Sequence, residues 1–179
     1  IGAKSMTIRS MEKTKDVRFF LRKLLRDGKG NIYLYNDCLF LDTKAPKGLG
    51  TRIFANQVAK ARDMGFDRIE CDAYRNDQED PEYGKGVGYK VWPKMGYDGD
   101  VPENIVEKIP QEFLDRFKSA GLVEPTPRVR WFYEVAGGEE WWAKNGGGFD
   151  AVFDLKEGSN SLKVHDAYIA KKAAEAGQT

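Results

Sequence analysis

The chain has 179 residues, of which 41% are hydrophobic and 32% charged, the composition of an ordinary globular protein. Its 29 basic and 28 acidic residues give a net charge of +1, which argues against the concentrated basic surface that a nucleic-acid partner requires. No apolar run approaches the length of a membrane span and no signal peptide is visible, so we expect a cytoplasmic protein without membrane contact. The chain starts without Met, which is compatible with a processed product or with part of a longer chain.

Few residues of the chain are suited to metal or redox chemistry. Cys38 and Cys71 lie in apolar runs, which predicts free thiols in a reducing compartment, or simply no disulfide. A zinc site is not expected, because the single histidine, His165, has no CxxC pair or second His to join. His165 is interpreted either as a base or as a surface or packing residue. Residues 77–82 are interpreted either as a cation site or as a solvated turn, and their spacing fits no Ca²⁺ loop.

The first 42 residues predict a strand, a helix and a hairpin. Residues 6–10 alternate weakly and predict a strand. Residues 16–28 predict an amphipathic helix ended by Gly28 and Gly30. Asn36-Asp37 separates two apolar runs and predicts a two-residue hairpin turn. The apolar face of the expected helix comprises Val17, Phe20, Leu21, Leu24 and Leu25.

The middle of the chain alternates between helix and strand signals. Residues 50–64 predict an amphipathic helix ending at Gly65, with Phe54, Val58 and Ala61 on its apolar face. Residues 67–73 predict a strand. Residues 76–88 are acidic and aperiodic, which predicts a mobile surface loop. Residues 89–101 predict a short helix interrupted near Pro93, a turn and a further strand.

The last third predicts three helices and one strand. The helices are expected at 110–121, from a Thr126 N-cap followed by Pro127, and after a cap at Ser159 or Ser161; the strand is expected at 150–155. The aromatic residues of this third are too dense for a free tail, so it should dock on the core near residues 89–98 or on another subunit. These residues are Phe113, Phe117, Trp131, Phe132, Trp141, Trp142, Phe149 and Phe153.

Trp141-Trp142 has two interpretations. The pair is either a platform that stacks on a base or sugar ring, or one core residue beside one that covers the domain edge.

Gly48-Leu49-Gly50-Thr51, between an apolar strand and a long helix, matches neither the Rossmann nor the P-loop motif. Together with Gly65-Phe66, Asn76 and the block 92–97 (WPKMGY), it resembles the GNAT superfamily of acyl-CoA-dependent N-acyltransferases over about residues 31–98. The resemblance implies an α/β (α+β) fold with a twisted, mostly antiparallel sheet flanked by helices. Residues 1–100 would form this core, and residues 101–179 a helical accessory segment docked on it.

The resemblance also implies a coenzyme A site. Backbone N–H groups of the glycine loop and of the first helical turn would hold the pyrophosphate, since these donors and the helix dipole favour an anion. The cofactor would be acetyl-CoA or another acyl-CoA, with the edge of the strand at Phe40 and Leu41 along the pantetheine arm. The implied cofactor-binding residues are Phe40, Leu41, Lys47, Gly48, Leu49, Gly50, Thr51 and Asn76.

Two positions depart from the family pattern. Its Arg or Gln position is Ala45, with Lys44 and Lys47 as the neighbouring cations. The tyrosine that protonates the coenzyme A thiolate aligns with Trp92, whose indole N–H cannot transfer a proton at a useful pKa. Tyr89, one helical turn earlier, is the candidate substitute.

A base is also required. Asp42, at the end of its strand, is the preferred candidate over Glu70 and Asp72; the other interpretation of all three is a solvated strand carboxylate.

The leading hypothesis is therefore an acyl-CoA-dependent N-acyltransferase in which an unidentified amine, on a small molecule or a protein, attacks the thioester directly. The alternative is a catalytically inactive GNAT-like binding or structural module, for example in a phage particle or a larger assembly. A homo-oligomer is compatible with both hypotheses.

Overall fold

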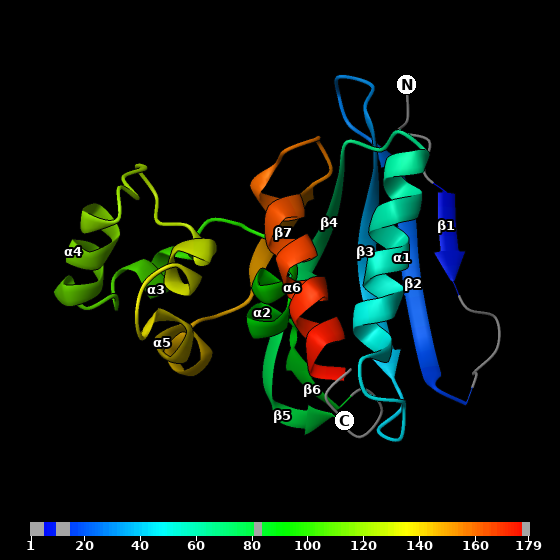
Figure 1. The fold of residues 1–179 in the computed structure, drawn as a ribbon, viewed down its shortest axis with the longest axis horizontal. Helices are drawn as coiled ribbons and strands as arrows, with labels where there is room; N and C mark the ends of the chain where they lie inside the picture. Colours follow the sequence, from blue (N-terminus) through cyan, green and yellow to red (C-terminus); the bar gives the residue numbers. More distant parts are fainter. Residues whose placement is uncertain (1–5, 10–14, 81–83, 177–179) are drawn as a thin grey trace. The chain divides into compact units, whose positions relative to one another are not determined.

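The computed structural model describes residues 6–9, 15–80 and 84–176 (Figure 1). These residues form a mixed five-stranded sheet in the order β1-β2-β3-β4-β7, a two-stranded sheet of β5 and β6, and six α-helices. The strands are β1 Met6–Arg9, β2 Val17–Arg26, β3 Ile32–Leu41, β4 Arg68–Ala73, β5 Arg75–Asp80, β6 Gly84–Val87 and β7 Phe149–Asp154. The helices are α1 Leu49–Asp63, α2 Gly88–Val91, α3 Glu103–Val106, α4 Gln111–Ser119, α5 Gly138–Asn145 and α6 Asn160–Ala176, with 3₁₀ helices η1 Pro93–Met95 and η2 Val129–Tyr133.

The chain divides into two compact units. Unit 1 contains the described residues of Ile1–Cys71 and Val152–Thr179, and unit 2 contains those of Asp72–Ala151. β4 and β7 each contribute residues to both units. The expected boundary after residue 100 falls inside unit 2, and residues 101–179 supply the sheet strand β7 as well as helices.

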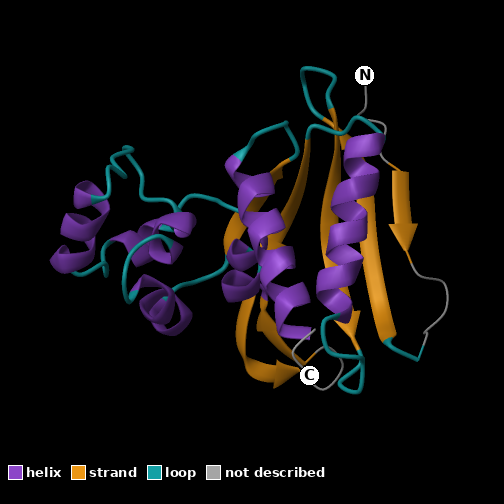
Figure 2. Ribbon diagram, in the orientation of Figure 1, coloured by secondary structure: helices purple, strands orange, loops and turns teal. Residues whose placement is uncertain are grey.

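The sheet of unit 1 is mixed, and α1 and α6 cover one of its faces. β2 pairs antiparallel with β1 and with β3, whereas β3 pairs parallel with β4. α1 and α6 lie side by side on the same face (Figure 2). Phe54 of α1 packs at 5.3 Å, edge to face, against Phe153 of β7, and both side chains are fully buried. The expected α/β class is confirmed at this level.

The helix expected over residues 50–64 is confirmed as α1. Phe54, Val58 and Ala61 are buried, and Gly65 after the helix has a φ of +72°. Gln57 shares the buried face.

The helix predicted over residues 16–28 is wrong: this segment is the ten-residue strand β2. It pairs with β1 on one side and β3 on the other, so its backbone groups are satisfied by two neighbours. The register shifts twice, leaving Arg18 as an extra residue on β2 and Asp37 as an extra residue on β3. Each bulge reverses the alternation of side chains between the two faces, and the resulting apolar spacing imitates a helical one.

The hairpin predicted at Asn36-Asp37 is also wrong, because β3 runs without a break through both residues. The turn lies instead between β2 and β3, where the Asp27 carboxylate accepts backbone N–H bonds from Lys29 and Asn31, and Gly30 has a φ of +90°. Asn36 is only 8% exposed and faces α1, where it bonds to Gln57. The polar pair therefore marks a bulge beside a buried amide contact.

The loop predicted over residues 76–88 is wrong for most of its length. Its described residues form the antiparallel pair β5 and β6, which neither composition nor periodicity indicated, while 81–83 lie outside the described residues. Gly86 permits close pairing, since a Cβ there would lie 2.7 Å from the Asn76 backbone nitrogen. Where the strand was expected after Gly96, the structure has isolated bridge residues at Asp98 and Asp100 and no strand, and Asp100 pairs with Arg128.

Within unit 2, part of the last third packs against residues 89–98. The Trp142 indole donates to the Tyr89 carbonyl at 2.8 Å, and the buried Arg130 guanidinium donates to the Pro93 carbonyl at 2.7 Å. The Tyr133 hydroxyl donates to the Lys90 carbonyl at 3.1 Å.

The helices of the last third follow the predictions unevenly. α4 is as expected, although Pro110 is its N-cap and not part of its first turn. The helix expected from Pro127 is only the short η2, which begins at Val129. The strand expected over 150–155 is β7. Ser159 is the cap of α6, accepting the Leu162 N–H at 3.2 Å.

Candidate anion site at the start of α1

The loop that leads from β3 to α1 is fixed at its first residue. Asp42 Oδ1 accepts the Lys44 backbone N–H at 2.9 Å, and Asp42 Oδ2 accepts Arg18 Nε at 3.1 Å. The backbone hydrogen bond from Lys44, followed by that from Arg18, lowers the pKa of the Asp42 carboxyl. Asp42 is therefore ionised at neutral pH, and both of its oxygens accept hydrogen bonds that stabilise the loop.

The two glycines of the loop have different structural reasons. Gly48 is the N-cap of α1 with a φ of +81°, in the left-handed region that other residues adopt at a cost. Gly50 lies in the first turn, where a Cβ would stand 3.3 Å from Leu41 Cδ1 of β3. Gly48 thus turns the chain into the helix, and Gly50 lets the helix start pack closely on the strand.

The first turn of α1 has the features of an anion-binding helix start. The helical bonding begins with Arg52 N–H donating to the Gly48 carbonyl at 3.0 Å, so the N–H groups of Gly50 and Thr51 precede it. Gly48 provides no side-chain cap, and the first turn has no acidic residue. Both facts leave the positive end of the helix dipole without a negative side chain of its own.

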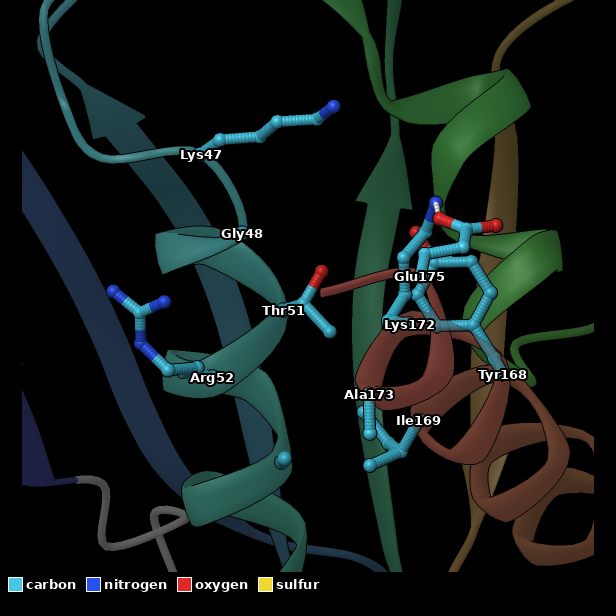
Figure 3. Close-up of a pocket in the computed structure, with 10 residues that line it drawn as sticks. Lys47, Gly48, Thr51, Arg52, Tyr168, Ile169, Lys172, Ala173 and Glu175 are labelled. Atoms are coloured by element: carbon cyan, nitrogen blue, oxygen red, sulfur yellow. Dashed lines mark hydrogen bonds and ion pairs between the residues drawn. The ribbon is translucent and has the colours of Figure 1, made fainter. Parts of the chain in front are cut away.

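A cavity of about 720 Å³ opens beside this helix start, between α1 and the last turns of α6 (Figure 3). Lys47 and the Thr51 hydroxyl point toward α6, whereas the Arg52 side chain extends away from it. Lys172 and Glu175 of α6 form an ion pair at 2.7 Å within the lining. The described residues that line the cavity are Lys47, Gly48, Thr51, Arg52, Ala55, Tyr168, Ile169, Lys172, Ala173 and Glu175.

The cavity unites part of the residue set that the sequence suggested. Lys47, Gly48 and Thr51 line it, and Gly50 and Leu49 belong to the same helix start. Phe40 and Leu41 end the strand that leads to it.

Sequence reasoning missed the α6 contribution. Tyr168, Lys172 and Glu175 recur at four- and three-residue spacing on one helix face, a signal that was visible, but nothing in the sequence brings that face to α1.

Three of the other candidates, Tyr89, Trp92 and Asn76, belong to unit 2. The Tyr89 side chain is 3% exposed and its hydroxyl donates to the Ala143 carbonyl at 2.7 Å. Trp92 is half-buried, with its ring 5.3 Å from that of Tyr97. Asn76 is part of β5, opposite Gly86.

The other candidate base residues are on β4. Glu70 is bonded to Arg68 at 2.5 Å, and Asp72 is exposed. Glu70 thus has an ion-pair partner and Asp72 is solvated, as the interpretation of both as surface strand carboxylates expects.

His165 is a packing residue of α6. It is 6% exposed, and its ring lies 5.7 Å from Phe54 and 5.8 Å from Phe153, edge to face in both cases. Its Nδ1 lies 3.0 Å from an oxygen of Asp166.

Within the described ranges, no three His, Cys, Asp or Glu side chains gather in a way that could hold a metal ion. None of the helices in those ranges is long and apolar enough to cross a membrane. Comparison of the chain with protein-family models, curated proteins and solved structures found no match.

Proposed function

We propose that the protein is an acyl-CoA-dependent N-acyltransferase of GNAT type, and that the start of α1 holds the pyrophosphate of the acyl-CoA. The observation that carries this proposal is the cavity at the uncapped start of α1, where Gly48 has a left-handed conformation and where Lys47 and Lys172 are lining residues. Backbone donors and cations converging on one space are what a diphosphate requires.

The order and direction of β3, α1 and β4 also support this proposal. β3, α1 and β4 form a strand–helix–strand unit whose two strands are parallel, the order that the GNAT resemblance implies. The parallel register joins Leu34–Asn36 to Ile69–Cys71, and β3 continues past the bulge at Asp37 toward the glycine loop. This continuation, which includes Phe40 and Leu41, is the proposed contact for the pantetheine arm.

In the proposed reaction, the amine nitrogen bonds to the thioester carbonyl carbon and the C–S bond breaks. The nitrogen loses a proton and the departing thiolate gains one. Because hydrogen bonds from Lys44 and Arg18 lower the pKa of Asp42, its carboxylate is a weak base and is poorly suited to removing the proton of the amine in full. Positioning of the two substrates would then supply much of the rate.

The second candidate is a module that binds the cofactor without turnover. The Tyr89 hydroxyl is buried and already donates to a backbone carbonyl, and the indole N–H of Trp92 is too weak an acid to protonate a thiolate. Under this alternative, coenzyme A binds, but no amine is acylated.

The test is titration of the purified chain with coenzyme A by calorimetry, comparing Thr51→Glu with Ala59→Glu. A glutamate at position 51 stabilises the helix start while repelling phosphate, so we expect affinity to fall about tenfold or more without loss of fold. Ala59 is exposed on the same helix outside the cavity, so its variant adds the same charge and should bind normally. No binding by the unaltered chain at millimolar coenzyme A would overturn the proposal.

A thiol-release assay with acetyl-CoA and a panel of amines separates the two candidates. Turnover in Trp92→Phe close to that of the unaltered chain would support the enzyme with Trp92 as a packing residue. Binding without release for every amine would favour the module.

A further inference from the structure

The last turn of α6 places a carboxylate among the cations of the proposed phosphate site. Glu175 lines the cavity with Lys47 and Lys172, and among the lining residues that the structure describes it is the one acidic side chain. Its Oε2 lies 2.7 Å from Lys172 Nζ, with the two side chains 47% and 41% exposed. The pair thus stands at an accessible position, where a bound phosphate would meet it.

The contacts of Glu175 favour its charged form. The hydrogen bond from Lys172 is the main cause that lowers its pKa, and the charges of Lys172, Lys171 and Lys47 act in the same direction. The same hydrogen bond raises the pKa of Lys172. Lys47, from the other side of the cavity, therefore contributes to the field in which the carboxylate is held.

We propose that Glu175 acts as an internal competitor for the anion site, occupying Lys172 until the phosphates of a ligand displace it. This proposal rests on the proposed function and adds a regulatory role for the end of α6. The ligand must replace the carboxylate–ammonium pair with a phosphate–ammonium pair. The free energy needed to break the contact between Glu175 and Lys172 therefore weakens the binding of the phosphate.

The proposal predicts opposite effects for the two partners. Removing the charge in Glu175→Gln frees Lys172 and leaves Lys47 and Lys172 without this carboxylate, so coenzyme A should bind about three- to fivefold more tightly, as expected for loss of an exposed pair. Lys172→Gln should weaken binding. In the Lys172→Gln background, Glu175→Gln should have a smaller effect, because its main partner is gone.

The control is Glu157→Gln, which removes the same charge from an exposed residue that pairs with Arg62 and lies outside the cavity lining. Each variant is titrated with coenzyme A and, separately, with inorganic pyrophosphate, at low and at physiological salt. Tighter binding of both ligands by Glu175→Gln alone supports the proposal, and the gain should shrink at higher salt.

Equal affinities for the unaltered chain, Glu157→Gln and Glu175→Gln would overturn the competitor role while leaving the proposed function standing. A gain of the same size in Glu157→Gln would also overturn it, since the effect would then be one of net charge. Failure of every variant to bind coenzyme A and pyrophosphate would overturn the proposed function, and the competitor role with it.

Discussion

Asn36 and Gln57 exchange two hydrogen bonds in the interior of unit 1. Asn36 Nδ2 donates to Gln57 Oε1 at 3.0 Å, and Gln57 Nε2 donates to Asn36 Oδ1 at 2.6 Å. Both residues are only 8% exposed. The pair joins the middle of β3 to the middle of α1 and so fixes the position of the helix over the strand. The glycine loop connects the end of this strand to the start of this helix.

Substituting either amide alone should be costly. Gln57→Leu leaves a buried Asn36 amide without this partner, and we expect the free energy of unfolding to fall by about 1–3 kcal/mol. The double variant Asn36→Leu/Gln57→Leu should lose less than the sum of the two single losses, because no polar group is then stranded. Urea unfolding of the four proteins measures the coupling; additive losses would mean that the two amides do not act as a pair.

The Asn36 contact also shows why β3 could not be read from the sequence. Asn-Asp between apolar runs indicates a turn when local interactions determine the conformation of the segment. Here the amide is satisfied by a residue 21 positions away, and Asp37 fits as the extra residue of a bulge. The hydrogen bond to Gln57 and the bulge at Asp37 both depend on residues distant in the chain, so the local sequence pattern does not predict them.

Replacing Gly48 tests whether its conformation is structural. Gly48→Ala should lower the free energy of unfolding by about 1–2 kcal/mol, since a φ of +81° is unfavourable for a residue with a Cβ. Gly48→Asn should cost less, because Asn tolerates the left-handed region. Gly28→Ala is the control: no atom lies within 4 Å of its added Cβ and its φ is not positive. Equal losses at positions 28 and 48 in urea unfolding would contradict this account.

The glycine loop and α1 were predictable because their signals are local. Phe54, Val58 and Ala61 recur at helical spacing, and Gly65 ends the helix in a conformation that suits glycine. The other wall of the cavity was not predictable. Lys172 and Glu175 come from a helix more than 100 residues later in the chain. The packing of Phe54 against His165 and Phe153 is a tertiary contact that joins this helix to α1.

The Cys38 thiol should react slowly. Burial is the main cause that raises its pKa, and the nearby charge of Asp37 adds to it. Below the raised pKa the thiol is mostly protonated, so its reaction with a disulfide reagent at pH 8 should be slower than in the unfolded chain. Asp37→Asn in a Cys71→Ala background should lower the pKa and shift the rate profile to lower pH.

Asp63→Asn, at the exposed end of α1, is the matched control and should leave the profile unchanged. If Asp37→Asn has no effect between pH 7 and pH 10, the carboxylate does not contribute to the shift.

Trp141 and Trp142 are adjacent in sequence but differ in burial, as one of the two interpretations required. Trp142 is fully buried, and its indole N–H donates to the Tyr89 carbonyl. Trp141 is half-buried and stacks on Phe132 at 5.0 Å with an interplanar angle of 7°. The sequence indicated that one tryptophan would be buried and the other partly exposed. Which of the two is buried depends on the face of α5 that packs against Phe132 and Phe149.

The two tryptophans should therefore respond differently to the same substitution. Trp142→Phe removes part of a fully buried ring and leaves the Tyr89 carbonyl without its donor, so we expect a loss of about 2–4 kcal/mol. Trp141→Phe keeps an aromatic ring against Phe132 at a site with solvent access, and should cost less than about 1 kcal/mol. Urea unfolding followed by circular dichroism gives both values, and similar losses would show that Trp142 is not the anchor of this cluster.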